Sequence, residues 1–297
     1  MTGRPVSRLQ TFTLKARYDG STRMPGRTII ITGASDGIGA AAARELSGKG
    51  DTIVLVGRSP QKTEAIAKEL DAPFHVADFS KLDDVRQLAA TLESAYPHIN
   101  VLANNAGGIM GAREITADGF EKTLQVNHLA PFLLTNLLMP TLVASSATVI
   151  GTASVANQLY AKLDIDDLQN ARKYSPNKAY GDAKLANILF ARELDFRFRE
   201  QGIHSASFHP GVIATNFAAD SSSPLRIVYR SVLSRFLGSA ETGADTLVWL
   251  ATSRPGVDWP LGAYFSKRRV TKANPQAYET GLANRLWEES AKMVGLS

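Results

Sequence analysis

A glycine-rich turn between an apolar run and an alanine-rich segment constrains the fold most strongly. The apolar run at 28–31 predicts a buried strand, and the segment at 40–46 predicts a helix. Glycines between them let the backbone approach a bound group, and the helix N-terminus offers free N–H groups to an anion. The turn therefore predicts a dinucleotide site, with a simple tight strand-to-helix connection as the alternative. Its predicted cofactor-binding residues are Gly33, Ser35, Asp36, Gly37, Ile38 and Gly39.

The rest of the chain alternates short β-branched runs with longer helical patterns. This alternation is typical of an α/β fold, a Rossmann-type doubly wound parallel sheet with helices on both faces. In such a sheet, the ligand crevice lies at the carboxyl ends of the strands. The predicted strands are 27–32, 52–57, 73–76, 100–103, 147–152, 204–209 and 262–265. The predicted helices are 38–48, 60–70, 82–96, 118–144, 176–200, 240–251 and 275–294.

The order of these elements predicts one domain over residues 27–297 of the 297-residue chain. Two connections, 153–175 and 212–239, are longer than usual, and long loops over a crevice often determine specificity. Residues 1–26 form a basic extension that we expect to be flexible. This extension carries most of the net charge of +5, so the body of the chain is nearly neutral. Nucleic-acid binding is therefore not expected.

Composition excludes several other classes of site and location. The chain has no cysteine and no clustered histidine pattern, so neither a disulfide nor a metal site is predicted. Its N-terminus lacks the apolar core of a signal peptide, and no run of about 18 apolar residues suggests an integral membrane segment. We therefore expect a cytoplasmic protein.

The residues after the second predicted strand bear on the choice of dinucleotide. An acidic residue usually binds the ribose 2′-OH of NAD at this point, but here the strand is followed by Arg58 and Ser59. A guanidinium can pair with a 2′-phosphate, which favours NADP(H) and leaves NAD(H) possible. The negative charge of Asp36 argues against this preference. Arg58 could alternatively be a solvated residue at the start of a helix.

Three further strand ends carry candidate cofactor-binding residues. Asp78 and Phe79 follow the third strand, where Asp78 could accept from adenine or cap the next helix. Small residues follow the fourth strand and allow close backbone approach, although Asn and Gly also suit a turn with positive φ. A Pro-Gly turn follows the sixth strand, with His209 expected to be structural. The predicted residues of the last two segments are Asn105, Ala106, Gly107, Pro210, Gly211, Ile213 and Thr215.

Tyr180 and Lys184 are the candidate catalytic pair. They are four residues apart in a predicted helix, so both lie on one face within mutual reach. A phenol has a reference pKa of about 10, and a neighbouring ammonium favours the phenolate that proton transfer near neutral pH requires. The same spacing also occurs in ordinary surface pairs.

Two polar residues strengthen the catalytic interpretation. Ser154 follows the fifth strand at the same crevice, where its hydroxyl could hold a substrate carbonyl oxygen or cap a turn, and Thr152 is the competing hydroxyl. Asn127 lies inside a predicted helix, where its side chain could divert a backbone hydrogen bond and hold a water beside Lys184. Otherwise, Asn127 would simply be solvated.

These motifs together resemble the short-chain dehydrogenase/reductase superfamily. The resemblance covers about residues 27–265, with the motifs in family order, although Ala153 stands where the family often has a first serine. The segments 125–129, 166–169, 184–187 and 284–288 further resemble the retinol-dehydrogenase-like branch. The resemblance implies oxidoreduction of apolar aldehydes, ketones or alcohols with NADP(H) or NAD(H). It also implies association into a homodimer or homotetramer through the helices at 118–144 and 176–200.

The expected reaction passes hydride between nicotinamide and a carbonyl carbon. Tyr180 would donate the proton, Ser154 would hold the oxygen, and Lys184 would fix the ribose. An amphipathic pattern over 225–237 predicts an apolar lid over the crevice, an ordinary packed helix or, less favoured, a membrane contact. The alternatives to an oxidoreductase are a nucleotide-binding sensor without turnover and an epimerase or dehydratase of the same fold.

Overall fold

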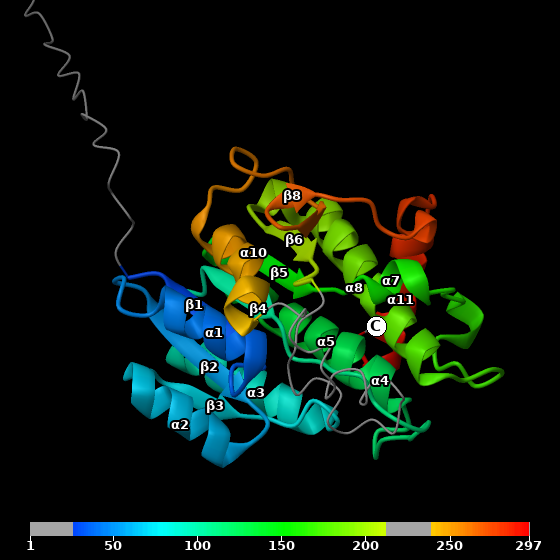
Figure 1. Cartoon of the computed structure of the whole chain (residues 1–297), viewed down its shortest axis with the longest axis horizontal. Coiled ribbons are helices and arrows are strands. Elements are labelled where there is room, and N and C mark those ends of the chain that lie inside the picture. Colours follow the sequence, from blue (N-terminus) through cyan, green and yellow to red (C-terminus); the bar gives the residue numbers. More distant parts are fainter. Residues whose placement is uncertain (1–25, 212–238, 297) are drawn as a thin grey trace, which may run out of the picture.

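The computed structural model describes residues 26–211 and 239–296. The basic extension and most of the predicted loop 212–239, including the apolar pattern at 225–237, lie outside the described residues. Figure 1 labels the elements along the chain.

One mostly parallel sheet of eight strands organises the described residues, in the order β3-β2-β1-β4-β5-β6-β7-β8. Among these eight described strands, only the β7–β8 pair is antiparallel. Each predicted strand is present, and the α/β fold class is confirmed. The strands are β1 (Thr28–Thr32), β2 (Thr52–Gly57), β3 (Phe74–Val76), β4 (Val101–Asn104), β5 (Thr148–Thr152), β6 (His204–Phe208), β7 (Tyr264–Ser266) and β8 (Arg269–Val270).

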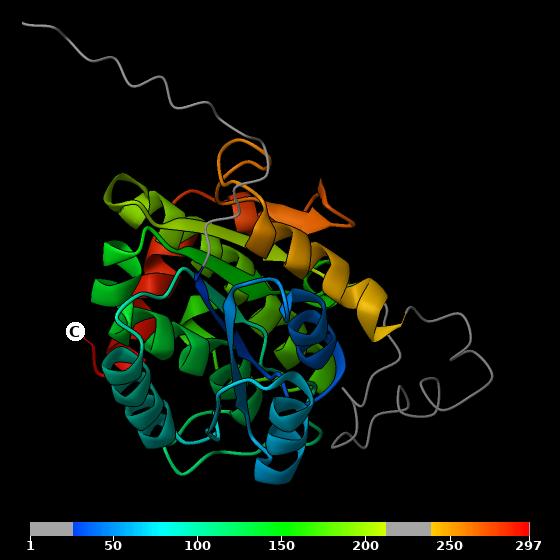
Figure 2. The same cartoon turned by 90° about the vertical axis from the view of Figure 1, so that its left-hand side faces the viewer.

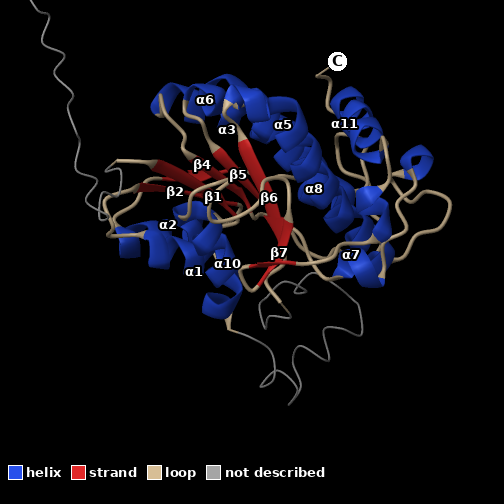
Figure 3. Cartoon of the chain, turned by 90° about the horizontal axis from the view of Figure 1, so that it is seen from above, coloured by secondary structure: helices blue, strands red, loops and turns tan. Residues whose placement is uncertain are grey.

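Helices cover both faces of this sheet, as Figure 3 shows in a view along the layers. Alternate residues of β1 point to opposite faces, so Ile30 joins one core and Ile29 and Ile31 join the other. On the second face α1 and α10 lie side by side (Figure 2). The long helices are α1 (Gly37–Leu46), α2 (Pro60–Leu70), α3 (Leu82–Ala95), α5 (Ala130–Leu137), α8 (Pro176–Phe198), α10 (Ala240–Thr252) and α11 (Leu282–Met293).

The predicted helix 118–144 is wrong as a single element. It consists of α4 (Lys122–Leu124), the π-helical turn η1 (Gln125–Leu129), α5 and α6 (Met139–Ala144). The first turn begins late because the Glu121 carboxylate accepts hydrogen bonds from the N–H groups of Thr123 and Leu124. The later break precedes Pro140, which has no N–H to donate within a helix.

The predicted helix 275–294 is also interrupted. Asn274 caps the short 3-10 helix η6 (Pro275–Tyr278), and Gly281 adopts a φ of +78° before α11 begins. The predicted connection 153–175 contains two short helices, α7 (Ala156–Leu159) and η2 (Ile165–Asp167), and a third, η3 (Arg199–Gln201), follows α8. In the described ranges, no helix combines the length and apolar character required to cross a bilayer.

The C-terminal helix α11 packs against α8 and the segment that contains η1 and α5. The Trp287 ring packs against the rings of Phe132 and Phe190, at centroid distances of 5.0 and 5.6 Å respectively. His128 Nε2 lies 2.9 Å from Ser290 Oγ, so the π-helical turn is tied to α11. Complete burial lowers the pKa of His128 from 6.5 to about 4.

This pKa predicts acid sensitivity that originates at His128. The folded state binds the proton more weakly than the unfolded state, so the stabilisation is complete above pH 6.5 and is lost as pH falls toward 4. Between pH 7.5 and 5, we expect a loss of about 2 kcal/mol in the free energy of unfolding. His128→Gln should remove this part of the pH dependence in urea titrations. The exposed His98→Gln should retain it, and equal slopes in all three proteins would contradict the assignment.

Candidate functional site

A cavity of about 490 Å³ opens at the carboxyl ends of the parallel strands. Strand β1 pairs with β2 on one side and with β4 on the other. The strand order therefore reverses here: β2 and β3 extend the sheet in one direction from β1, and β4 to β8 extend it in the other. The cavity lies where doubly wound sheets bind their ligands. Its lining includes Gly33, Arg58, Asp78, Asn105, Ser154 and Pro210, which follow the first six strands in turn.

The glycine-rich turn forms one wall through its backbone. Gly33 and Gly37 adopt φ angles of +67° and +53°, which favour glycine. Asp36 caps α1 by accepting a hydrogen bond from the N–H of Gly37 at 2.7 Å. Ser35 and Ile38 also line the cavity. Gly39 lies behind this wall, where a Cβ would come within 2.3 Å of the Gly33 carbonyl oxygen.

Two positively charged side chains line the cavity near the end of β2 and the start of α2. Arg58 and Ser59 both line it, and Ser59 caps α2. Lys62, which the sequence interpretation missed, also lines it and pairs with Asp36 at 3.2 Å. The Asp36 charge that argued against a phosphate is therefore offset by an adjacent ammonium. Lys62 follows the helix-capping Ser59 by three residues, so helical spacing could have revealed it.

Asp78 and Phe79 line the cavity beyond β3. The alternative role of Asp78 as the cap of α3 is wrong. Its carboxylate accepts hydrogen bonds from the backbone and hydroxyl of Ser80, at 3.0 and 2.8 Å. The first N–H of α3, from Leu82, instead donates to Asp118.

The segment after β4 lies close against β1. Asn105 Nδ2 donates to the Thr32 carbonyl at 2.9 Å, and the backbone N–H groups of Asn105 and Ala106 donate to Thr32 Oγ1. None of residues 104–108 has a positive φ, so the alternative of a positive-φ turn is wrong. Gly107 instead permits close packing, because a Cβ there would lie 2.4 Å from Asn127 Oδ1 and 3.1 Å from Lys184 Nζ.

Helix α8 carries Tyr180 and Lys184 to the cavity, and both line it. The Lys184 ammonium lies 5.5 Å from the centre of the Tyr180 ring and donates to the Thr152 carbonyl at 3.0 Å. Lys184 is 1% exposed, and this burial lowers the pKa of its ammonium to about 7. The neighbouring Gly181 allows α8 to approach α7, since a Cβ there would lie 2.9 Å from the Ala156 carbonyl oxygen.

Asn127 lies behind this pair in the π-helical turn η1. Its Nδ2 donates to the carbonyls of Thr123 and Gly108, and its Oδ1 accepts from the Gly108 N–H. The bond to Thr123, four residues earlier, diverts a carbonyl from the α-helical pattern, as the sequence interpretation expected. Asn127 is fully buried and is not a solvated residue. The water that it was expected to hold remains a prediction.

The two candidate hydroxyls after β5 differ in their partners. Thr152 Oγ1 donates to Asn105 Oδ1 at 3.3 Å. Ser154 Oγ accepts from the N–H of Ala156 at 3.2 Å, which leaves its own proton to be donated. Ser154 therefore both caps a turn and lines the cavity.

Pro210 and Gly211 complete the lining beyond β6. His209 Nδ1 accepts from the Gly211 N–H at 3.1 Å, consistent with the structural role expected for it. Ile213 and Thr215 lie outside the described residues. The lining also includes apolar residues that the sequence interpretation missed because they follow a glycine pair or adjoin a polar motif: Ile109, Met110 and Val126.

A parallel sheet with a glycine-rich turn and a tyrosine–lysine pair at one cavity defines a class of nicotinamide-dependent oxidoreductases. The model of the short chain dehydrogenase family matches residues 27–225. The chain belongs to this family of oxidoreductases.

Individual relatives extend this match over nearly the whole chain. The Streptomyces sp. (strain C5) protein named "Putative daunorubicin C-13 ketoreductase" is 41% identical over 279 residues, which cover 92% of this chain and 94% of the relative. Human retinol dehydrogenase 12 is 36% identical over 93% of this chain and 89% of its own length. Both support the retinol-dehydrogenase-like branch.

A solved structure from Mycobacterium paratuberculosis has the same fold. This uncharacterized protein is 31% identical, with a TM-score of 0.72 over 91% of this chain and 95% of its own.

Proposed function

We propose that this protein is an NADP(H)-dependent carbonyl reductase that acts on apolar ketones or aldehydes and can work in reverse on the alcohols. The observation that carries the proposal is the convergence of Tyr180, Lys184 and Ser154 on one cavity. The cavity also contains the glycine-rich turn at the N-terminus of α1. Family membership supports the oxidoreductase chemistry, and the substrate and cofactor preference are the proposed part.

The residues present fit a dinucleotide. A Cβ at Gly33 would lie 2.8 Å from Ala106 Cα, so only glycine fits where this turn meets the segment after β4. The N–H groups at the start of α1 would hold the pyrophosphate, and Asp78, Asn105 and Ala106 would contact the adenosine. A nicotinamide dinucleotide bound here would supply hydride for reduction or accept it in the reverse reaction.

The chain's own residues would move and hold the proton. Tyr180 would donate its phenolic proton to the substrate oxygen, and Ser154 would donate a hydrogen bond to the same oxygen. The adjacent Lys184 ammonium would stabilise the negative charge left on Tyr180 and hold the nicotinamide ribose. Asn127 would maintain the Gly107–Gly108 backbone against Lys184.

The preference for NADP(H) rests on Arg58 and Lys62. Arg58 lines the cavity at the end of β2, and Lys62 offsets the nearby Asp36, so the one net positive charge of these three side chains favours a 2′-phosphate over a free hydroxyl. Arg58→Leu is expected to lower kcat/KM for NADPH by about 10- to 100-fold, because a charge-assisted hydrogen bond contributes about 1.5–3 kcal/mol. The value for NADH should change by less than about twofold.

Lys68→Met is the matched control for this change. Lys68 lies in α2, the helix that begins just after Arg58, and it pairs with Glu64 away from the cavity lining. Removal of the Lys68 charge should leave kcat/KM unchanged with both NADPH and NADH. Parallel losses with NADPH and NADH in Arg58→Leu would contradict the assigned phosphate contact.

The apolar substrate is supported by the wall beside Tyr180. Ile109 packs with Tyr180 and lines the cavity, as do Met110, Val126 and Ala153. The relatives are named for a daunorubicin ketone and for retinol, which suggests a large apolar substrate. We further propose a single cytoplasmic domain over 27–297 that associates into a homodimer or homotetramer.

NADPH oxidation followed by absorbance with a panel of ketones and aldehydes tests the proposal. Large apolar carbonyl compounds should be reduced with higher kcat/KM than small or charged ones. NADPH binding without turnover of any of them would favour the sensor alternative. Epimerisation or dehydration without net cofactor oxidation would favour an epimerase or dehydratase of the same fold.

A further inference from the structure

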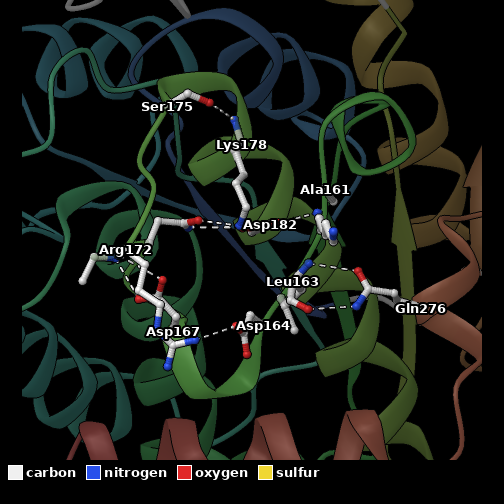
Figure 4. Close-up of polar contacts among 12 residues, drawn as sticks. Ala161, Leu163, Asp164, Asp167, Arg172, Ser175, Lys178, Asp182 and Gln276 are labelled. Carbon is white, nitrogen blue, oxygen red and sulfur yellow. Dashed lines mark hydrogen bonds and ion pairs between the residues drawn. The ribbon is translucent and has the colours of Figure 1, made fainter.

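The loop that follows β5 is held by a segment from near the C-terminus. Gln276 pairs with Leu163 through two hydrogen bonds, from Gln276 Nε2 to the Leu163 carbonyl at 2.8 Å and from the Leu163 N–H to Gln276 Oε1 at 2.9 Å (Figure 4). Asn274 Nδ2 donates to the carbonyls of Asn157 and Ala161, at 2.9 and 3.2 Å. Residues 272–276 thus fix the course of residues 157–163, which follow Ser154.

The opposite side of this loop is fixed by α8. The Lys162 N–H donates to Asp182 at 2.8 Å. Asp182 also pairs with Lys178 (Figure 4). The loop is therefore anchored at both of its sides by side chains that lie outside the cavity lining. Such anchoring is the kind of support that keeps a hydroxyl in one place.

Asn157 connects this anchoring to Ser154. Its side chain is fully buried, and its Nδ2 donates to the Ser154 carbonyl at 2.6 Å and to Tyr264 Oη at 3.0 Å. Its Oδ1 accepts from the Asn274 N–H at 2.8 Å. Both Nδ2 protons are thus engaged, and this neutral amide joins the turn after β5 to β7 and to the C-terminal segment.

The same turn determines the direction of the Ser154 hydroxyl. The backbone N–H of Asn157 also donates to the Ser154 carbonyl, at 3.1 Å, and the N–H of Ala156 donates to Ser154 Oγ at 3.2 Å. The hydrogen bonds of the turn Ser154–Asn157 therefore fix both the position of the Ser154 backbone and the orientation of its hydroxyl. Movement of Asn157 would move the Ser154 oxygen with it.

We propose that Asn157 is a positioning residue for Ser154, held in place by Tyr264 and Asn274. It does not line the cavity and acts only through the turn. The inference rests on the proposed role of Ser154 as the hydrogen-bond donor to the substrate oxygen. Without the Asn157 side chain, Ser154 would keep its hydroxyl but lose its fixed orientation.

A double-mutant cycle in the full-length protein tests this inference. Asn157→Ala is expected to lower kcat for ketone reduction about tenfold, with the Kd for NADPH unchanged, because a misdirected donor weakens only the reacting arrangement. In the Ser154→Ala background, the same change should lower kcat by less than about twofold, since the group it positions is gone. A merely structural role would lower Tm without this dependence on Ser154.

Two further variants keep the test decisive. Tyr264→Phe removes only one partner of Asn157 and should give a smaller loss of kcat that also depends on Ser154. This variant serves as the test if Asn157→Ala fails to fold. Asn100→Ala is the matched control, because Asn100 Oδ1 holds the Thr28 N–H at the amino end of the sheet. It should lower Tm and leave kcat unchanged.

The outcomes separate the two proposals. Wild-type kcat in Ser154→Ala would overturn the proposed role of Ser154 itself. A reduced kcat in Ser154→Ala, with wild-type kcat in folded Asn157→Ala and Tyr264→Phe, would overturn the positioning role alone. Losses from Ser154 and Asn157 that multiply independently would also overturn it.

Discussion

Tyr180→Phe is expected to lower kcat by about a thousandfold with NADPH and an apolar ketone, within the range typical of a lost general acid. The change removes one hydroxyl and keeps a ring that is 5% exposed and packed with Ile109 and Ala156. Because the ring remains, the packing of α8 and the Kd for NADPH should be preserved. Steady-state kinetics and a binding titration measure the two quantities separately.

Tyr160→Phe provides the matched control for this loss. Tyr160 is exposed and does not line the cavity, although it lies in the loop after β5. Its kcat should equal that of the wild type. If Tyr180→Phe retained more than about a tenth of wild-type kcat, the phenol would not be the proton donor.

Gly107→Ala is expected to lower kcat/KM by about 100-fold, although it adds a single methyl group. The new Cβ would lie 2.4 Å from Asn127 Oδ1 and 3.1 Å from Lys184 Nζ, so these two polar atoms or the backbone must move. A displacement of about 1 Å at a reacting group can cost about this factor. Overpacking should also reduce the free energy of unfolding by about 1–3 kcal/mol.

Gly151→Ala tests whether the effect depends on this particular contact. Gly151 lies in β5, and a Cβ there would have its nearest neighbour at 3.8 Å, an ordinary contact distance. We expect nearly wild-type kinetics and stability. Similar losses in both variants would mean that the site does not depend on the close approach at Gly107.

The central sheet could be predicted because its strands carry their signal locally. Runs such as Ile29–Ile31 and Ile53–Val56 are apolar on both faces, as buried parallel strands must be. The short β8 had no such signal. Its turn uses Lys267 and Arg268 at φ angles of +49° and +59°, in place of the Asn-Gly pair that usually marks a hairpin.

Helix interruptions were harder to predict because side chains cause them. The residues at 118–144 have a continuous helical pattern, but Asn127 binds the Thr123 carbonyl and produces a π-helical turn. Which carbonyl a buried amide selects depends on its tertiary neighbours, here the Gly108 backbone. A sequence pattern therefore indicates the helix and not its irregular turn.

The candidate site could be predicted to the extent that its residues follow strand ends. Arg58, Asp78, Asn105 and Ser154 are recognisable in this way, and each lines the cavity. Lys62 and Met110 reach the same cavity from within a helix and a connecting segment, where position along the sequence gives weaker guidance. The amide Asn157 gave no signal, because its partner Asn274 lies 117 residues later.

The dependence of the β5 loop on residues 272–276 has a consequence for synthesis on the ribosome. Strands β1 to β4 and the glycine-rich turn emerge early and can assemble the dinucleotide half while translation continues. Asn274 and Gln276 emerge much later, so the Ser154 turn gains its lateral support only near the end of elongation. In a nascent chain that ends before residue 272, the Ser154 turn would therefore lack both of these partners.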